Sequence, residues 1–205
     1  MYKRVFKRVI DVLISFFALL MLWPLFIVIA ILIKKEDKGP VFYMQRRTGK
    51  DGKVFEMYKF RSMNVVPRGQ EMTISHDKRV TKIGKFLRNT SLDELPQFIN
   101  VLVGDMSFIG PRPWITEYYD NFTDKQKRRV EVKPGIIGLA QAKGRNGLTI
   151  FQKINYDIEY VNNISFKMDC KILIESIKIV LKKEHAEIIQ EDITNELNEL
   201  KTQFN

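Results

Sequence analysis

Cysteine and histidine are scarce in this chain, which has one cysteine and two histidines in 205 residues. Because Cys170 has no second cysteine to pair with, an intrachain disulfide is excluded, and so are the cysteine clusters that hold structural zinc. The sequence also lacks internal repeats and low-complexity tracts, which excludes a repeat array. A chain of this length suits one compact domain with an added element.

Acidic residues are fewer than basic ones, with 24 Asp and Glu against 34 Lys and Arg, so the formal net charge is +10. Such an excess suits an anionic partner. Nucleic acid, a lipid surface and a phosphorylated substrate all meet this condition, and charge by itself does not choose among them.

Charge is absent from Val12 to Ile33, a run of about 22 residues that is close to the roughly 20 needed for a helix to cross a bilayer. A cleavable signal peptide is disfavoured, because the run is too long and Lys34 begins a charged stretch where a small-residue cleavage site should stand. Pro24 lies near the middle of the run and predicts a kink in the helix.

Both ends of this apolar run carry basic residues, which are Lys3, Arg4, Lys7 and Arg8 before it and Lys34, Lys35, Lys38, Arg46 and Arg47 after it. The positive-inside rule therefore places both ends in the cytoplasm. A helix broken at Pro24 would have two arms of about 17 Å each, roughly one leaflet. We expect a re-entrant helix over residues 1–36, with a kinked span as the alternative. The carbonyl freed near Leu20 is the main cost of the re-entrant form.

The remainder of the chain predicts an α+β fold in which helices predominate, with one globular domain over residues 37–183. Val41–Gln45 and Val54–Phe60 read as strands, and turn residues over Thr48–Gly52 join them into a β-hairpin. The stretch Val65–Asp77 has few apolar residues and predicts a surface loop.

Periodic apolar residues predict helices at Val80–Leu87, Leu92–Leu102, Trp114–Lys127, Ile150–Val161 and Phe166–Lys182. The last of these fits an interfacial amphipathic helix and a core helix with a basic outer face equally well. Residues 184–205 are charged and predict a solvated helix or a partly disordered extension. Loops rich in Gly and Pro, Gly104–Pro113 and Lys133–Gly138, suit a ligand held close to the backbone, although ordinary turns use the same residues.

The adjacent acids Asp93 and Glu94 form the most suggestive local pattern. Ser91 and Glu94 have the spacing of a capping box, and taken alone a helix cap is the simpler explanation. The alternative is chemical, since two neighbouring carboxylates at a helix N-terminus supply a nucleophile and a Mg²⁺ ligand where backbone N–H groups attract phosphate. Arg88 and Arg112 are candidates to offset phosphate charge, although either alone is typical of a protein surface.

Several motifs follow one another along the chain: the Pro-broken helix, Lys59-Phe60-Arg61-Ser62-Met63, Ser91-Leu92-Asp93-Glu94-Leu95-Pro96-Gln97, Gly104-Asp105-Met106-Ser107-Phe108-Ile109-Gly110-Pro111-Arg112-Pro113 and Lys133-Pro134-Gly135. In this order they resemble the small monotopic phosphoglycosyl transferases, bacterial sugar transferases that act on polyprenyl phosphate. Among these, the chain most resembles the diacetylbacillosamine-1-phosphate transferases. The resemblance extends from Met1 to about Val180. One departure is Trp23, which stands before Pro24 where the family commonly has serine.

The resemblance implies a two-step reaction in which Asp93 attacks a UDP-sugar, UMP leaves, and undecaprenyl phosphate takes up the sugar-1-phosphate. The sugar is expected to be an N-acetylated amino sugar, and Glu94 is expected to bind Mg²⁺. The substrate-binding positions implied are Lys59, Arg88, Pro111, Arg112, Pro113, Gln141 and Arg145. The family also favours the re-entrant helix, in a bacterial plasma membrane with the catalytic domain on the cytoplasmic face.

Two other classes of protein compete with this interpretation. A membrane-anchored protein that binds anionic lipid headgroups would use the basic charge and leave Asp93 and Glu94 as a helix cap. A nucleic-acid-binding domain fits the charge as well, but the apolar segment and the absence of a recognisable reading motif disfavour it.

Overall fold

A computed structural model describes residues 1–64, 79–144, 147–181 and 193–202 of the chain. The loop expected at Val65–Asp77 and the residue Arg145 lie outside these ranges. Helices predominate and the strands are short, so the predicted α+β fold is confirmed.

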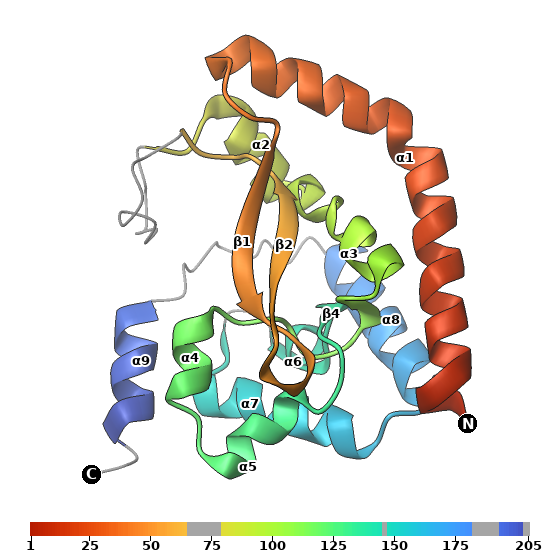
Figure 1. Ribbon diagram of the computed structural model, residues 1–205, viewed down its shortest axis with the longest axis vertical. Coiled ribbons are helices and arrows are strands. Elements are labelled where there is room, and N and C mark those ends of the chain that lie inside the picture. The colour runs from red at the N-terminus through yellow and green to blue at the C-terminus, as the bar shows by residue number, and fades with distance from the viewer. Residues whose placement is uncertain (65–78, 145–146, 182–192, 203–205) are drawn as a thin grey trace.

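Helix α1 (Lys7–Asp37) is the longest element, and a π-helical turn, Tyr2–Phe6, precedes it. Pro24 lies inside the helix, and Figure 1 shows α1 bent into two arms, as the sequence predicts. By length and composition alone, α1 is apolar enough to cross a membrane. Trp23, beside the proline, is 58% exposed.

Both arms of α1 contact the globular part of the protein. In the first arm, Arg8 donates to the carbonyl of Leu102 (2.9 Å) at the end of α3 (Gln97–Val103). In the second arm, the Glu36 carboxylate accepts the backbone N–H of Lys82 (2.7 Å) at the start of α2 (Lys82–Asn89). The two ends of the apolar helix are therefore anchored to the same domain (Figure 1).

The predicted hairpin is confirmed, because β1 (Phe42–Thr48) pairs antiparallel with β2 (Val54–Phe60) along its whole length. Asn100 of α3 is fully buried and binds the outer edge of β2. Its amide donates to the carbonyl of Glu56 (2.7 Å) and accepts the N–H of Tyr58 (2.9 Å). Helix α3 and the hairpin are thus held in one fixed relation.

A second, parallel pair of strands was not predicted: β3 (Ser107–Ile109) pairs with β4 (Gly135–Ile137). These strands lie inside the two Gly- and Pro-rich loops, and their pairing brings those loops together. The contact requires glycine, because a Cβ on Gly135 would lie 2.1 Å from the nitrogen of Gly110. A core of buried side chains packs around this pair, made of Ile109, Val132, Leu139, Ala142, Tyr160, Val161 and Ile172.

The remaining helices are α2 (Lys82–Asn89), α4 (Thr116–Asp120), α5 (Asp124–Lys127), α6 (Leu139–Gly144), α7 (Ile150–Asn162), α8 (Phe166–Leu181) and α9 (Ile193–Thr202), with 3-10 turns at Lys50–Gly52, Leu92–Glu94 and Arg128–Val130.

Two predicted helices are each divided. The one expected at Leu92–Leu102 becomes a 3-10 turn and α3, which begins after Pro96. The one expected at Trp114–Lys127 becomes α4 and α5, because Thr123 starts a new helix through a capping box with Gln126.

The two C-terminal helices differ in how they meet the domain. Helix α8 buries Ile172 completely but leaves Ile174 and Ile177 about half exposed, so it has both a core face and an outward apolar face. Helix α9 lies in the charged extension, for which a solvated helix was one of two expectations. It also packs against the domain, since Leu200 is fully buried in the cluster that contains Trp114.

Candidate active site

Strand β2 and the residues after it send their side chains in alternate directions. Phe60 is buried against α1 and α2, whereas Lys59 points to the other face and donates to Glu94 (2.9 Å). Ser62 accepts a hydrogen bond from Nε of Arg88 (2.9 Å). The Lys59–Met63 motif therefore holds two of the predicted basic residues in place.

The capping box predicted for Ser91 and Glu94 is wrong. Ser91 has a left-handed backbone (φ 57°, ψ 17°), and its side chain makes no capping hydrogen bond. Glu94 instead accepts hydrogen bonds from Lys59 (2.9 Å) and from Nη2 of Arg112 (2.6 Å). The acids lie in a three-residue 3-10 turn, not in the first turn of a long helix, so the predicted helix N-terminus contributes nothing here.

The charge of Glu94 is stabilised by its two basic neighbours. Burial by itself would raise the pKa of this carboxyl, but the charges and hydrogen bonds of Arg112 and Lys59 outweigh burial and hold the pKa well below its usual value. Glu94 is thus an anion that links the hairpin to the loop that carries Arg112.

Asp93 has a different environment, although it is adjacent in sequence. It is only 8% exposed, and within the described ranges no group hydrogen bonds to its carboxylate. Burial raises the pKa of Asp93, and the charge of Glu94 adds to this, while Lys59, Arg88 and Arg112 oppose it. Both carboxylate oxygens remain available, in a setting of three basic side chains, as a nucleophile directed at phosphate requires.

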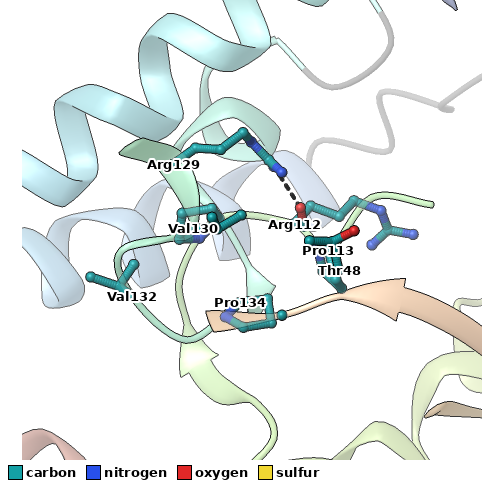
Figure 2. Close-up of a pocket in the computed structure, with 9 residues that line it drawn as sticks. Thr48, Arg112, Pro113, Arg129, Val130, Val132 and Pro134 are labelled. Atoms are coloured by element: carbon teal, nitrogen blue, oxygen red, sulfur yellow. Dashed lines mark hydrogen bonds between the residues drawn. The ribbon is translucent and has the colours of Figure 1, made fainter. Parts of the chain in front are cut away.

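Arg112 lies in a loop that is held from behind. Its carbonyl accepts a hydrogen bond from Arg129 (2.7 Å), and Figure 2 shows its guanidinium directed away from that contact. The carbonyl of Pro111 accepts the N–H of Gly135 (2.9 Å). Pro111 and Pro113, expected to bind substrate, line the small cavity in Figure 2, which has no room for a water molecule. This cavity is a packed joint that supports the loop.

Gln141 lies on α6 behind the same loop. Its Nε2 is 3.5 Å from the carbonyl of Ile136, and its buried Oε1 has no hydrogen-bond partner among the described residues. A Cβ added at Gly138 would lie 3.0 Å from this oxygen and 3.6 Å from the nitrogen of Arg112. Gln141 is therefore near the backbone of the Arg112 loop, and nothing described connects it directly to Asp93.

The structure thus brings five predicted residues into one site: Lys59, Arg88, Asp93, Glu94 and Arg112. It also adds supporting residues that the sequence reasoning missed, namely Asp11, Asn100, Arg129 and Asp157, all of them buried. Asp11, Asn100 and Asp157 share a signal, because each is a polar residue between apolar neighbours, which requires a partner elsewhere in the fold. Arg129 has no such signal, since it lies in a run of charged residues.

No group of three or more His, Cys, Asp or Glu side chains is placed to hold a metal ion in the ranges that the structure describes. A magnesium ion does not need such a group, because Mg²⁺ is commonly bound by one or two carboxylates together with substrate phosphates and water. Glu94 suits that role: among the described residues, its Oε2 accepts one hydrogen bond, the longer contact with Arg112 (3.3 Å), and its side chain is 20% exposed.

Comparisons with known proteins show the family of this chain. The family described as bacterial sugar transferase matches residues 2–183. UDP-glucose:undecaprenyl-phosphate glucose-1-phosphate transferase of Klebsiella pneumoniae is 45% identical over 82% of this chain and 38% of its own length. Undecaprenyl-phosphate galactose phosphotransferase of Salmonella typhimurium is 36% identical over 90% of this chain and 42% of its own length. Exopolysaccharide production protein PSS of Rhizobium leguminosarum is 39% identical over 82% and 92%.

The extent of these matches differs among the relatives. The chain spans about two fifths of the length of the Klebsiella and Salmonella proteins, but nearly all of the Rhizobium protein. The similarity therefore covers a complete unit in one relative and one part of a longer protein in the others.

Proposed function

Because the chain belongs to the bacterial sugar transferase family, we propose that it transfers a sugar-1-phosphate from a UDP-sugar to undecaprenyl phosphate and releases UMP. The names of the Klebsiella and Salmonella relatives support this reaction. The observation that carries the proposal is Asp93, a buried carboxylate without a hydrogen-bond partner among the described residues, beside three basic side chains. The product would be the first lipid-linked sugar of a polysaccharide or glycoprotein.

The proposed reaction has two displacements at the same phosphorus. A carboxylate oxygen of Asp93 attacks the β-phosphorus of the UDP-sugar, the bond between this phosphorus and the bridging oxygen breaks, and UMP leaves with the bonding electrons. An oxygen of undecaprenyl phosphate then attacks the phosphorus and frees Asp93. Lys59, Arg88 and Arg112 would offset the charge on the transferred group.

We also propose that Glu94 binds Mg²⁺ during this reaction. Bound by the Glu94 carboxylate, the ion would supply positive charge to offset the charge that develops on the phosphate groups. Lys59 and Arg112 hydrogen bond to Glu94, so they lie beside the carboxylate that would hold the ion. Their own part is to orient the phosphates and to keep the carboxylate ionised.

We propose a re-entrant topology for α1, with both ends on the cytoplasmic side of the plasma membrane. Its support is that Arg8 and Glu36, near the two ends of α1, both bond to the one globular domain, since a domain cannot lie on both sides of a bilayer. Large apolar side chains of the bent middle are exposed, including Phe17, Leu20 and Met21, as expected of groups that face lipid.

Topology is testable with single cysteines near Lys3 and Lys38 in a Cys170→Ala background. A membrane-impermeant maleimide applied to inverted vesicles should label both sites, and the same reagent applied to right-side-out vesicles should label neither. Labelling of the two sites from opposite sides would show a kinked span instead.

The identity of the sugar is the finest part of the proposal. The resemblance to diacetylbacillosamine-1-phosphate transferases favours an N-acetylated amino sugar, whereas the relatives named above act on glucose and galactose by their names. A panel with UDP-glucose, UDP-galactose, UDP-N-acetylglucosamine and UDP-diacetylbacillosamine separates these donors.

The test of the function mixes the purified full chain with Mg²⁺, undecaprenyl phosphate and this panel, and measures UMP. We expect one donor to release UMP, and Asp93→Asn to abolish release, while Asp120→Asn, an exposed acid on α4, serves as the matched control and retains it. No release from any donor would contradict the enzyme proposal.

A second measurement addresses the intermediate. Without the lipid acceptor, the two-step reaction releases about one UMP per enzyme and leaves the phospho-sugar on Asp93, which intact-protein mass spectrometry detects. Full turnover with acceptor, but no release and no mass increase without it, would instead indicate direct transfer.

A further inference from the structure

Arg129 is a buried arginine outside the predicted site, and it links helix α7 to the loop that carries Arg112. It is 2% exposed. Its Nη2 donates to Asp157 (2.6 Å) and to the carbonyl of Arg112 (2.7 Å), and its Nε donates to the same oxygen of Asp157 (3.0 Å). Its guanidinium carbon lies 4.2 Å from the ring centre of Trp114, two residues beyond Arg112.

A buried ion pair is in general a weak source of stability. Removing two charges from water is costly, and apolar side chains of similar volume often stabilise a protein equally well or better. Burial raises the pKa of Asp157 while the charge of Arg129 opposes it, which indicates that the pair carries this cost. A role beyond stability would explain why Arg129 and Asp157 occupy this joint.

The geometry assigns such a role through the backbone of Arg112. Pro111 and Pro113 flank this residue, and proline restricts both its own φ and the conformation of the residue before it. With the neighbouring peptides restricted, the carbonyl held by Arg129 sets the direction in which the Arg112 side chain leaves the loop. That side chain reaches Glu94, beside Asp93, at 2.6 Å.

Resting on the function proposed above, we propose that Arg129 is a positioning residue that aims Arg112 at the transferred phosphate, with Asp157 as its counter-ion. Figure 2 shows the arrangement: Arg129 approaches the Arg112 carbonyl from one side, and the Arg112 guanidinium leaves on the other. The chain of contacts runs from Asp157 on α7 to Glu94 in the site, and Arg129 itself touches no reacting atom.

The first test separates positioning from packing. Arg129→Met with Asp157→Leu replaces the charged pair by apolar side chains, which should preserve folding, but it removes the donor to the Arg112 carbonyl. We expect the unfolding temperature to stay near that of the parent while kcat/KM for UMP release falls on the order of 10-fold to 100-fold, the effect of a displaced catalytic group. Arg128→Met, an exposed neighbour on the same turn, is the control and keeps the parent rate.

Arg129→Lys and Asp157→Asn serve if the double variant does not fold. Lysine keeps the buried positive charge but lacks the planar fork that serves Asp157 and the Arg112 carbonyl together. Asparagine leaves the arginine and its bond to that carbonyl in place. We expect the lysine variant to lose more activity than the asparagine variant; the reverse order would overturn the proposal.

A double-mutant cycle measures whether the effects of replacing Arg129 and Arg112 on kcat/KM are coupled, which a purely structural role for Arg129 would not predict. If Arg129 acts through Arg112, its replacement should have less than about a 2-fold further effect in an Arg112→Lys background, because the side chain that it positions is already altered. If the fold losses in kcat/KM of the two single variants multiply in the double variant, Arg129 acts independently of Arg112, and the proposal is overturned. An inactive parent protein is a different result, which contradicts the proposed function and not this inference.

Discussion

Replacing Asp11 by alanine should weaken the contact between helix α1 and the segment that leads into the Arg112 loop. Asp11 is 4% exposed on the first arm of α1, and its carboxylate accepts the hydroxyl of Ser107 (2.7 Å) and the N–H of Phe108 (3.0 Å). Both residues belong to β3, which continues within three residues into Pro111 and Arg112. Asp11 therefore holds the strand from which the Arg112 loop begins.

The cost of this change follows from the groups that lose their acceptor. The part-buried Phe108 N–H would lose its acceptor, which costs about 1 to 3 kcal/mol of folding free energy. The Ser107 hydroxyl keeps a second acceptor, the Ile109 carbonyl at 3.0 Å, so its loss lies near 1 kcal/mol. The sum is about 3 kcal/mol, or about 6 to 12 °C in unfolding temperature for a chain of this size.

Thermal unfolding in detergent micelles measures this shift, and UMP release measures its effect on activity. Ser15→Ala is the matched control, because Ser15 lies one helical turn along the same arm, is fully buried, and its Oγ has no hydrogen-bond partner among the described residues. We expect no destabilisation from that control and a lower kcat/KM from Asp11→Ala. An Asp11→Ala protein that unfolds at the parent temperature would refute the reasoning.

Four further predictions follow from the site. Burial raises the pKa of Asp93, so ionisation of this carboxyl destabilises the folded protein as pH rises from the ordinary aspartate pKa through the raised value. The inactive variant Asp93→Asn should therefore unfold at a higher temperature than the parent at pH 7. A lower unfolding temperature would contradict this. For the same reason, kcat/KM should begin to fall at a higher pH than an ordinary aspartate would give when the assay is acidified. Gly84→Ala should lower the free energy of unfolding by about 1 to 3 kcal/mol, because the added Cβ would lie 1.9 Å from the carbonyl oxygen of Ser62 and push α2 and Arg88 away. Chemical denaturation measures this loss. Chelation by EDTA should stop UMP release and added Mg²⁺ should restore it, whereas full activity in EDTA would remove the metal from the proposal.

Local patterns in the sequence were sufficient for several elements of the structure. The apolar run, the bend expected at Pro24 and the β-hairpin were predicted correctly, because hydrophobic periodicity and the missing proline N–H act within a few residues of chain. The acid pair Asp93 and Glu94 also stood out from the local sequence, but the helix cap that was its simpler explanation is wrong. Ser91 and Glu94 have the capping-box spacing, yet no capping box forms, because the Glu94 carboxylate is bound by Lys59 and Arg112.

Other features depend on residues that are distant in the chain, and only the tertiary structure shows them. The pairing of β3 with β4 joins segments that each resemble an ordinary loop, and the bond from Arg129 to the Arg112 carbonyl spans 17 residues. A three-residue strand has too little pattern to be recognised by itself, and a buried arginine has no local signature of its partner. The sequence by itself thus determined the long apolar helix, its bend and the hairpin, whose causes are local. The tertiary structure decided which side chains surround Asp93 and what holds Arg112, because burial and ion pairing arise only when distant segments pack together.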